Sequence, residues 1–296
     1  MATKARRFCT WILPAREGAK LMHSGSMLKQ LPDLDRWFGA HQKIDRLAWR
    51  YASELDPTLA SEFPGIREIL RFEGRDGPDG IKLKTPGEGE PWHFYNPNDE
   101  TDTDLLRIIE QHHKKLVGAI RESNITRASF EAAWLAHAVV DGLTPAHQYP
   151  YEQELERLRG GQGKETRDSP KGKLLVPGET KRQQVKNNWR MWGDKGLLST
   201  HLAYEMGVAL IIMPLRYERI RRVFSRSLAP TQGKGYLGYF QAQAARVAEL
   251  DLYEQFYRSG WTPMVARRTR KELVPVLVET VAALWVSALR ASEKKQ

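Results

Sequence analysis

Cysteine is almost missing from this chain, since Cys9 is the only one among 296 residues. A single thiol cannot form a disulfide within the chain, which excludes a disulfide-rich scaffold and any metal site built from several thiolates. The shortage also agrees with a reducing compartment. Any metal ion held by this protein would therefore be bound through nitrogen and oxygen ligands.

Long hydrophobic runs and strand-like alternation are also missing. The apolar piece at residues 9–13 is shorter than the core of a secretory signal, so we expect a cytoplasmic protein. The most apolar later stretch, 273–289, is interrupted by Pro275 and Glu279 and is short for a bilayer span. It predicts a core helix and no transmembrane segment. Without alternating patterns or internal repeats, an all-α fold is expected.

Acidic residues are outnumbered, at 36 against 46 lysines and arginines, which gives a formal net charge of +10. Such an excess favours polyanionic partners, either nucleic acid or an anionic lipid surface, although proteins without such partners also carry it. The apolar fraction of 41% is typical of a folded protein. Residues 1–32 lack a sustained period and are expected to form an N-terminal arm before one helical domain over 33–292.

Histidine and aspartate occur at helical spacing in an Ala-rich stretch, predicted to be a helix from about Arg127 to Asp141. His137 and Asp141 are four residues apart, so both side chains project from one face. A glycine and Pro145 end the helix, and the turn brings His147 back toward that face. Imidazole and carboxylate are ligands that zinc takes when thiolates are absent. Taken alone, H-x-x-x-D is more often a core histidine with a capping aspartate.

The pattern of residues 34–51 is also helical, and it places His41 on the apolar face. A buried neutral histidine would fit that position without a metal ion. His112 and His113 lie in a later helical stretch but in no motif, and we expect them to be partly buried and exposed, respectively.

Residues 63–100 are rich in glycine, proline and charge, which predicts irregular structure through most of the segment. The aromatic block at 92–95 nevertheless indicates order, because three aromatic rings in sequence are seldom left in solvent. We expect this loop to fold over a site and to deliver Asp79 and His93. The alternative for His93 is an aromatic anchor beneath the loop.

Residues 152–190 are polar and contain ten lysines and arginines against six acids. They are expected to form an inserted basic loop, either a solvated mobile segment or a flap that binds phosphate groups. A helix follows from about Ser199, and His201 and Glu205 are four residues apart on it. A simple pair on the helix surface would have the same spacing.

Taken in order, these motifs resemble those of the zinc-dependent phospholipase C and S1/P1 nuclease superfamily. The H-x-x-x-D stretch followed by P-x-H matches its central motif, and the HFYNP segment at 93–97 resembles the phospholipase-like HFYDP. His41 resembles the early helical histidine, and the late H-x-x-x-E pair is present. Asp79 is the best candidate for the aspartate that precedes HFY, with Asp76 as its rival.

The resemblance covers residues 37 to 290 and implies a single multi-helix, all-α domain of the phospholipase C/P1 nuclease type with long loops. The metal ligands it implies are five imidazoles and three carboxylates: His41, Asp79, His93, His137, Asp141, His147, His201 and Glu205. One zinc ion would be held by Asp79, His93, His137 and Asp141, and a second by His147, His201 and Glu205.

About eight contacts suit two zinc ions. A third ion would use His41 with Asp141 bridging. In the family it also takes the free amino terminus of a processed tryptophan, for which Trp37 is the nearest equivalent. We therefore expect a third site to be weak or absent unless the chain is cut before Trp37.

The resemblance implies a phosphodiester hydrolase in which a metal-activated water attacks the phosphorus. Zinc lowers the pKa of bound water toward ~7 and acts as a Lewis acid, and Asp79 would be the catalytic residue that orients the water or accepts its proton. Glu205 and the HFYNP segment favour a phospholipase C. The alternative is a nuclease for single-stranded DNA or RNA, favoured by the charge and by stacking on Trp92, Tyr95 or Tyr149. The third hypothesis is a non-catalytic protein with a relict metal-binding site. The presence of all eight ligand-type residues argues against it.

Overall fold

The structure, a computed structural model, describes residues 39–74, 77–82, 85, 92–225 and 235–293. These residues form one helical domain with no β-strand among them, so the all-α prediction is confirmed. The first half contains α3 (Ala40–Leu55), α4 (Thr58–Glu62), α5 (Ile66–Ile69), η2 (Leu70–Phe72), α6 (Pro78–Lys82), α7 (Asp104–Arg121), α8 (Ile125–Gly142) and η5 (Pro145–His147). The second half contains α9 (Tyr151–Leu158), η6 (Lys164–Thr166), α10 (Pro170–Leu174), α11 (Lys181–Trp192), α12 (Leu197–Ile212), α13 (Tyr217–Ile220), η7 (Arg221–Val223), α14 (Gly235–Ala248), α15 (Leu252–Ser259), α16 (Pro263–Arg268), η8 (Thr269–Leu273) and α17 (Val274–Glu293).

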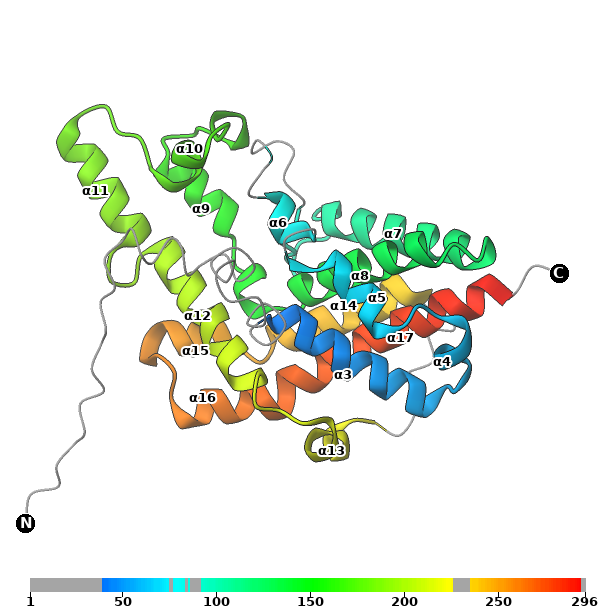
Figure 1. Cartoon of the computed structure of the whole chain (residues 1–296). Helices are drawn as coiled ribbons and strands as arrows, with labels where there is room; N and C mark the ends of the chain where they lie inside the picture. The colour runs from blue at the N-terminus through cyan, green and yellow to red at the C-terminus, as the bar shows by residue number, and fades with distance from the viewer. Residues whose placement is uncertain (1–38, 75–76, 83–84, 86–91, 226–234, 294–296) are drawn as a thin grey trace, which may run out of the picture.

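Helix α17 lies at the centre of the core, as predicted for residues 273–289. Its side chains are apolar on nearly every face, and α3, α7, α8 and α14 pack around it. The indole of Trp285 is fully buried and donates a hydrogen bond to the Ala132 carbonyl of α8, at 3.0 Å. Among the described residues, the helical run Pro263–Glu293 is long and apolar enough to cross a membrane, but 83% of its apolar window is buried inside the protein (Figure 1).

Pro275 does not end this run, although proline usually breaks a helix. It lacks the amide donor, and its ring crowds the carbonyl four residues earlier. The π-helical turn η8 immediately precedes α17, and a π turn is wider than an α turn. The wider turn gives the proline ring room, so the chain continues as one helix through the core.

Helix α8 is buried on almost all sides, and its alanines allow close approach of its neighbours. Gly142 at its C-terminal end is tightly enclosed: an added Cβ would lie 2.5 Å from Leu105 Cδ2 and 2.6 Å from Phe240 Cζ. The helix therefore places His137 and Asp141, which are only 4% exposed, inside the core instead of on the surface.

Two segments that were expected to be irregular contain helices. The basic segment 152–190 holds most of α9, all of η6 and α10, and most of α11, so the prediction of a loop is wrong. Its glycines and prolines separate short helices, and Ser169 and Thr180 cap α10 and α11 by accepting hydrogen bonds from backbone amides. The segment 63–100 similarly contains α5, η2 and α6.

The N-terminal arm predicted for 1–32, the tryptophan Trp37 and the alternative ligand Asp76 all lie outside the described residues.

His113 was expected to be exposed, but it is only 4% exposed. Its ring stacks on Tyr236 with the ring centroids 3.6 Å apart, and its Nε2 lies 3.3 Å from Ser287 Oγ. Burial lowers the pKa of His113 from its usual 6.5 to about 4. The folded protein therefore holds this imidazole in its neutral form at neutral pH.

This buried histidine predicts acid sensitivity. Between pH 6.5 and 4 the unfolded chain binds a proton at His113 that the native state does not, so stability is full above pH 6.5 and falls as the pH drops toward 4. The loss attributable to His113 is about 3 kcal/mol at most. His113→Phe keeps an aromatic ring at this position and removes the titration. Urea unfolding of both proteins at several pH values measures the difference in stability, and a difference that stays constant from pH 7 to 4 would contradict this prediction.

Candidate metal centre

Asp141 lies at the centre of the candidate site, close to three histidines from different segments. Its Oδ1 is 3.4 Å from His41 Nε2 and 3.4 Å from His147 Nδ1, and its Oδ2 is 3.4 Å from His137 Nε2. His137 shares the face of α8 through the four-residue spacing, whereas His41 comes from the first turn of α3. His147 lies in η5, beyond the turn that ends α8.

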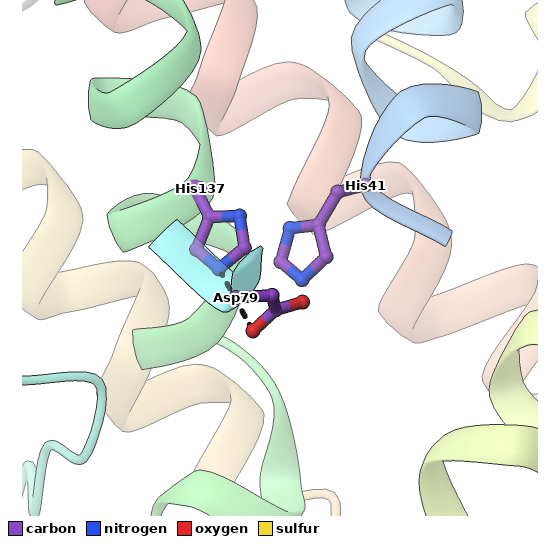
Figure 2. A group of neighbouring side chains, drawn as sticks. All are labelled: His41, Asp79 and His137. Atoms are coloured by element: carbon purple, nitrogen blue, oxygen red, sulfur yellow. Dashed lines mark ion pairs between the residues drawn. The ribbon is translucent and has the colours of Figure 1, made fainter. Parts of the chain in front are cut away.

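The first group of donors consists of His41, Asp79 and His137, and Figure 2 shows both imidazoles converging on the carboxylate. One donor atom from each residue lies within 4.8 Å of the others. The two rings are stacked, with centroids 3.9 Å apart and planes 7° from parallel, and His137 Nε2 is 3.6 Å from Asp79 Oδ1. The Asp79 side chain is 55% exposed, so this group opens toward solvent on the α6 side.

The second group consists of His147, His201 and Glu205. Glu205 Oε1 lies 2.7 Å from His147 Nε2 and 3.1 Å from His201 Nε2, and the two imidazole rings are stacked 5.0 Å apart. The four-residue spacing on α12 places His201 and Glu205 on one face. His147 joins the two groups, because its Nδ1 faces Asp141 and its Nε2 faces Glu205.

His93 lies beside these groups and belongs to neither of them. Its ring is 5.1 Å from that of His147, and it lines a pocket of about 280 Å³ together with Asp79, His137 and Asp141. A larger pocket of about 410 Å³ contains none of the eight candidate ligands. The smaller pocket is therefore the one whose wall contains candidate metal ligands.

The spacing of the donor atoms fits ligands of shared metal ions. Two ligand atoms at roughly 2.1 Å from one tetrahedral zinc ion lie about 3.4 Å apart, whereas N–H···O hydrogen bonds are usually about 2.7–3.2 Å long. His41 and His137 each lie 3.4 Å from an Asp141 oxygen, and the contact between His137 and Asp79 is 3.6 Å. The contact between His147 and Glu205, at 2.7 Å, is instead a hydrogen bond. Two buried clusters of His, Asp and Glu could therefore hold metal ions.

The charges in the site depend on one another. Burial would raise the pKa of Asp141, but the imidazoles of His137 and His147 lower it well below its usual value. Burial would lower the pKa of His147, but Asp141 and Glu205 raise it to about 9. Burial, followed by the neighbouring His137, lowers the pKa of His41. Without a cation, protons on the imidazoles compensate the carboxylates, so a metal ion has to displace protons to bind.

Sequence reasoning missed two buried carboxylates behind the first group. Glu73, just after η2, is 6% exposed, and its Oε2 lies 3.3 Å from His137 Nδ1. A carboxylate in this position fixes the tautomer and orientation of a metal-binding imidazole. Asp45 on α3 is 1% exposed, and burial, followed by the nearby Glu73, raises its pKa well above the usual value. The helical period of α3 could have placed Asp45 inside, but no motif indicated Glu73.

The structure gathers the predicted ligands around Asp141, with one difference in grouping. His41, expected at a third ion, lies with His137 and Asp79, whereas His93 lies beside the groups. The chain matches no family model, no curated protein and no solved structure. The function must therefore be argued from the geometry of this site.

Proposed function

We propose that this protein is a zinc-dependent phosphodiester hydrolase of the phospholipase C type. The observation that carries the proposal is the pair of adjacent donor groups joined through Asp141 and His147, with nitrogen–oxygen separations around Asp141 that are close to the edge of a zinc tetrahedron. Two neighbouring cations suit a phosphodiester, because both can neutralise charge on its oxygens. The ordered motifs along the chain point to the same chemistry.

The donor set favours two zinc ions. His41, Asp79, His137 and Asp141 would hold the first, and His147, His201 and Glu205 the second. Imidazoles outnumber carboxylates and no thiolate is present, which suits zinc better than magnesium or calcium. Because His41 joins the first group, the imidazole that was expected at a third ion is already used at the first.

Asp79 is the residue we assign to catalysis. Bound zinc would supply Lewis acidity and a lowered pKa for water. Partial loss of water contact at the pocket wall would raise the pKa of Asp79, but His137 and His41 lower it below its usual value, so the carboxylate is ionised. Its side chain is partly exposed and lines the pocket that also contains His93. An ionised carboxylate in this position can orient a water molecule and accept its proton.

Two observations favour a lipid over a single-stranded nucleic acid as the substrate. The pocket is lined by apolar and aromatic side chains, among them Ile108 and Trp134. Of the rings proposed for base stacking, Tyr95 is 4% exposed, and Lys164 Nζ lies 3.5 Å from the centre of the Trp92 ring. Tyr149 is 37% exposed, but it lines the other, larger pocket. Base stacking at the site would have to begin by displacing that lysine.

The proposal is tested by supplying the zinc-loaded protein with phosphatidylcholine and, separately, with a single-stranded oligonucleotide. We expect head-group release from the lipid alone. His137→Ala should abolish it and lower zinc per chain in elemental analysis. His112→Ala is the matched control, because His112 lines the same pocket but pairs with Glu131 and belongs to neither donor group.

Cleavage of the oligonucleotide alone would assign the protein to the nucleases. Bound zinc without turnover of either substrate would favour the metal-binding relict, and equal zinc content in wild type and His137→Ala would exclude the site.

A further inference from the structure

Helix α11 presents an apolar pair inside a row of cations, outside the metal centre. Val185 is 71% exposed and Trp189 is 69% exposed, and they lie one turn apart on the same face. Large apolar side chains with this exposure are normally scattered singly over a surface. Here two are adjacent on a helix that projects from the central bundle (Figure 1).

Cations border this pair on both sides, and α11 contains no acidic residue. At 100° per residue, Arg182, Lys186 and Arg190 follow one edge of the apolar pair and Lys181 lies at the other. Within the described ranges, no carboxylate forms an ion pair with any of these four side chains. The exposed face therefore combines an indole, an aliphatic side chain and four available positive charges.

The opposite face of α11 is fixed to the protein. Met191 is 1% exposed and packs in a small core with Phe94 and Tyr151. Asn188 forms two hydrogen bonds with the backbone of Val176, at 3.1 and 2.7 Å. The Phe94 ring lies 5.4 Å from that of His147, so this small core connects α11 with the metal centre. The outward face is consequently held in a set orientation relative to the site.

We propose that α11 docks the protein on an anionic lipid surface. Tryptophan is favoured at the boundary between headgroups and acyl chains, and lysine and arginine beside it contact lipid phosphates. Cations near such a surface each add to the affinity, and salt weakens that contribution. A docked α11 would hold the small core and the adjoining pocket close to the bilayer, where a phospholipid substrate lies.

A single-stranded nucleic acid fits this face less well. Its phosphates would match the cations and one base could stack on Trp189, but it offers no apolar partner for Val185. The lipid interface accommodates both side chains. The docking proposal is compatible with a lipid-directed hydrolase and does not depend on turnover, because binding to vesicles is measured without catalysis.

The test is co-sedimentation of the full chain with vesicles of phosphatidylcholine, with and without phosphatidylserine. We expect tighter binding to the phosphatidylserine vesicles and weaker binding in high salt. Arg182→Glu combined with Lys186→Glu should weaken binding by about thirtyfold or more, because each cation near the surface contributes about fivefold. Brominated lipid should quench the fluorescence of wild type more than that of Trp189→Phe, which keeps an apolar ring and should still bind.

The matched controls are Met264→Ala, which removes another exposed apolar side chain, and Arg267→Glu combined with Lys271→Glu, which makes the same charge change on α16 and η8. Equal binding of wild type to both vesicle types would overturn the proposal. Binding that is unchanged by the combined Arg182→Glu and Lys186→Glu substitutions, or lowered equally by the charge-reversal control, would do the same. If the Arg182→Glu and Lys186→Glu substitutions weakened the binding of a single-stranded oligonucleotide but left vesicle binding unchanged, the face would be assigned to nucleic acid instead.

Discussion

Asp141→Asn is expected to lower zinc affinity at both donor groups by more than about 100-fold and to abolish phosphodiesterase activity. The carboxylate lies 3.4 Å from imidazole nitrogens of His41, His137 and His147, so both groups depend on it. Substituting a residue that only orients a metal ligand already reduces affinity by about 10–100-fold, and loss of a shared carboxylate should exceed that. Elemental analysis and a competition titration with a chromogenic chelator measure the effect.

Asp45→Asn is the matched control for this substitution. Asp45 is also a buried aspartate, but it belongs to neither donor group. Its raised pKa favours the protonated form, which asparagine resembles in shape and charge. The control should keep the zinc content of wild type. If Asp141→Asn also bound two zinc ions per chain, the claim that both donor groups depend on the Asp141 carboxylate would be wrong.

Local spacing was enough to predict the elements that carry most of the site. The helix expected at about 127–141 spans Ile125–Gly142, and the helix expected from Ser199 begins at Leu197. In both, a four-residue interval determines which side chains share a face. The turn after α8 was equally predictable, because glycine and proline at its end have restricted roles.

The grouping of the ligands could not be read from spacing. His41 and His137 are far apart in sequence, and their stacking depends on how α3 packs against α8 and α17. Glu73 lies in a segment whose glycines and charges hid the short helices α5 and η2. Its role follows only from the 3.3 Å contact with His137, a tertiary contact without a local signal.

Composition was misleading in the basic segment 152–190. A high content of lysine, arginine and glycine suggested a solvated loop, but Leu155 and Val176, together with Met191 just beyond the segment, bury themselves in a second small core. Three apolar contacts spread over this length have no regular period, so they gave no signal in the sequence. Eight of the ten cations that suggested a mobile flap lie on helices, which gives them fixed positions.

The site places the charged side chains of His137 and Asp141, on α8, in the interior of the protein. Their burial links the binding of a metal ion to the stability of the fold. Asp141 and His137 are each 4% exposed, and buried charges need compensation that water cannot provide there. In the metal-free protein, that compensation comes from protons on the imidazoles. A cation that binds the native groups and not the unfolded chain must therefore shift the unfolding equilibrium toward the folded state.

Zinc should accordingly raise the melting temperature. An ion supplied at a thousandfold excess over its dissociation constant stabilises the native state by about 4 kcal/mol, which corresponds to roughly 7 °C for a chain of this length, and a second ion adds to the shift. Thermal unfolding followed by circular dichroism, with zinc and with a chelator, measures it. His113→Phe should retain the full shift because it lies outside the site, whereas Asp141→Asn should lose it. Equal melting temperatures with zinc and with chelator in wild type would show that these groups bind no zinc in the folded protein.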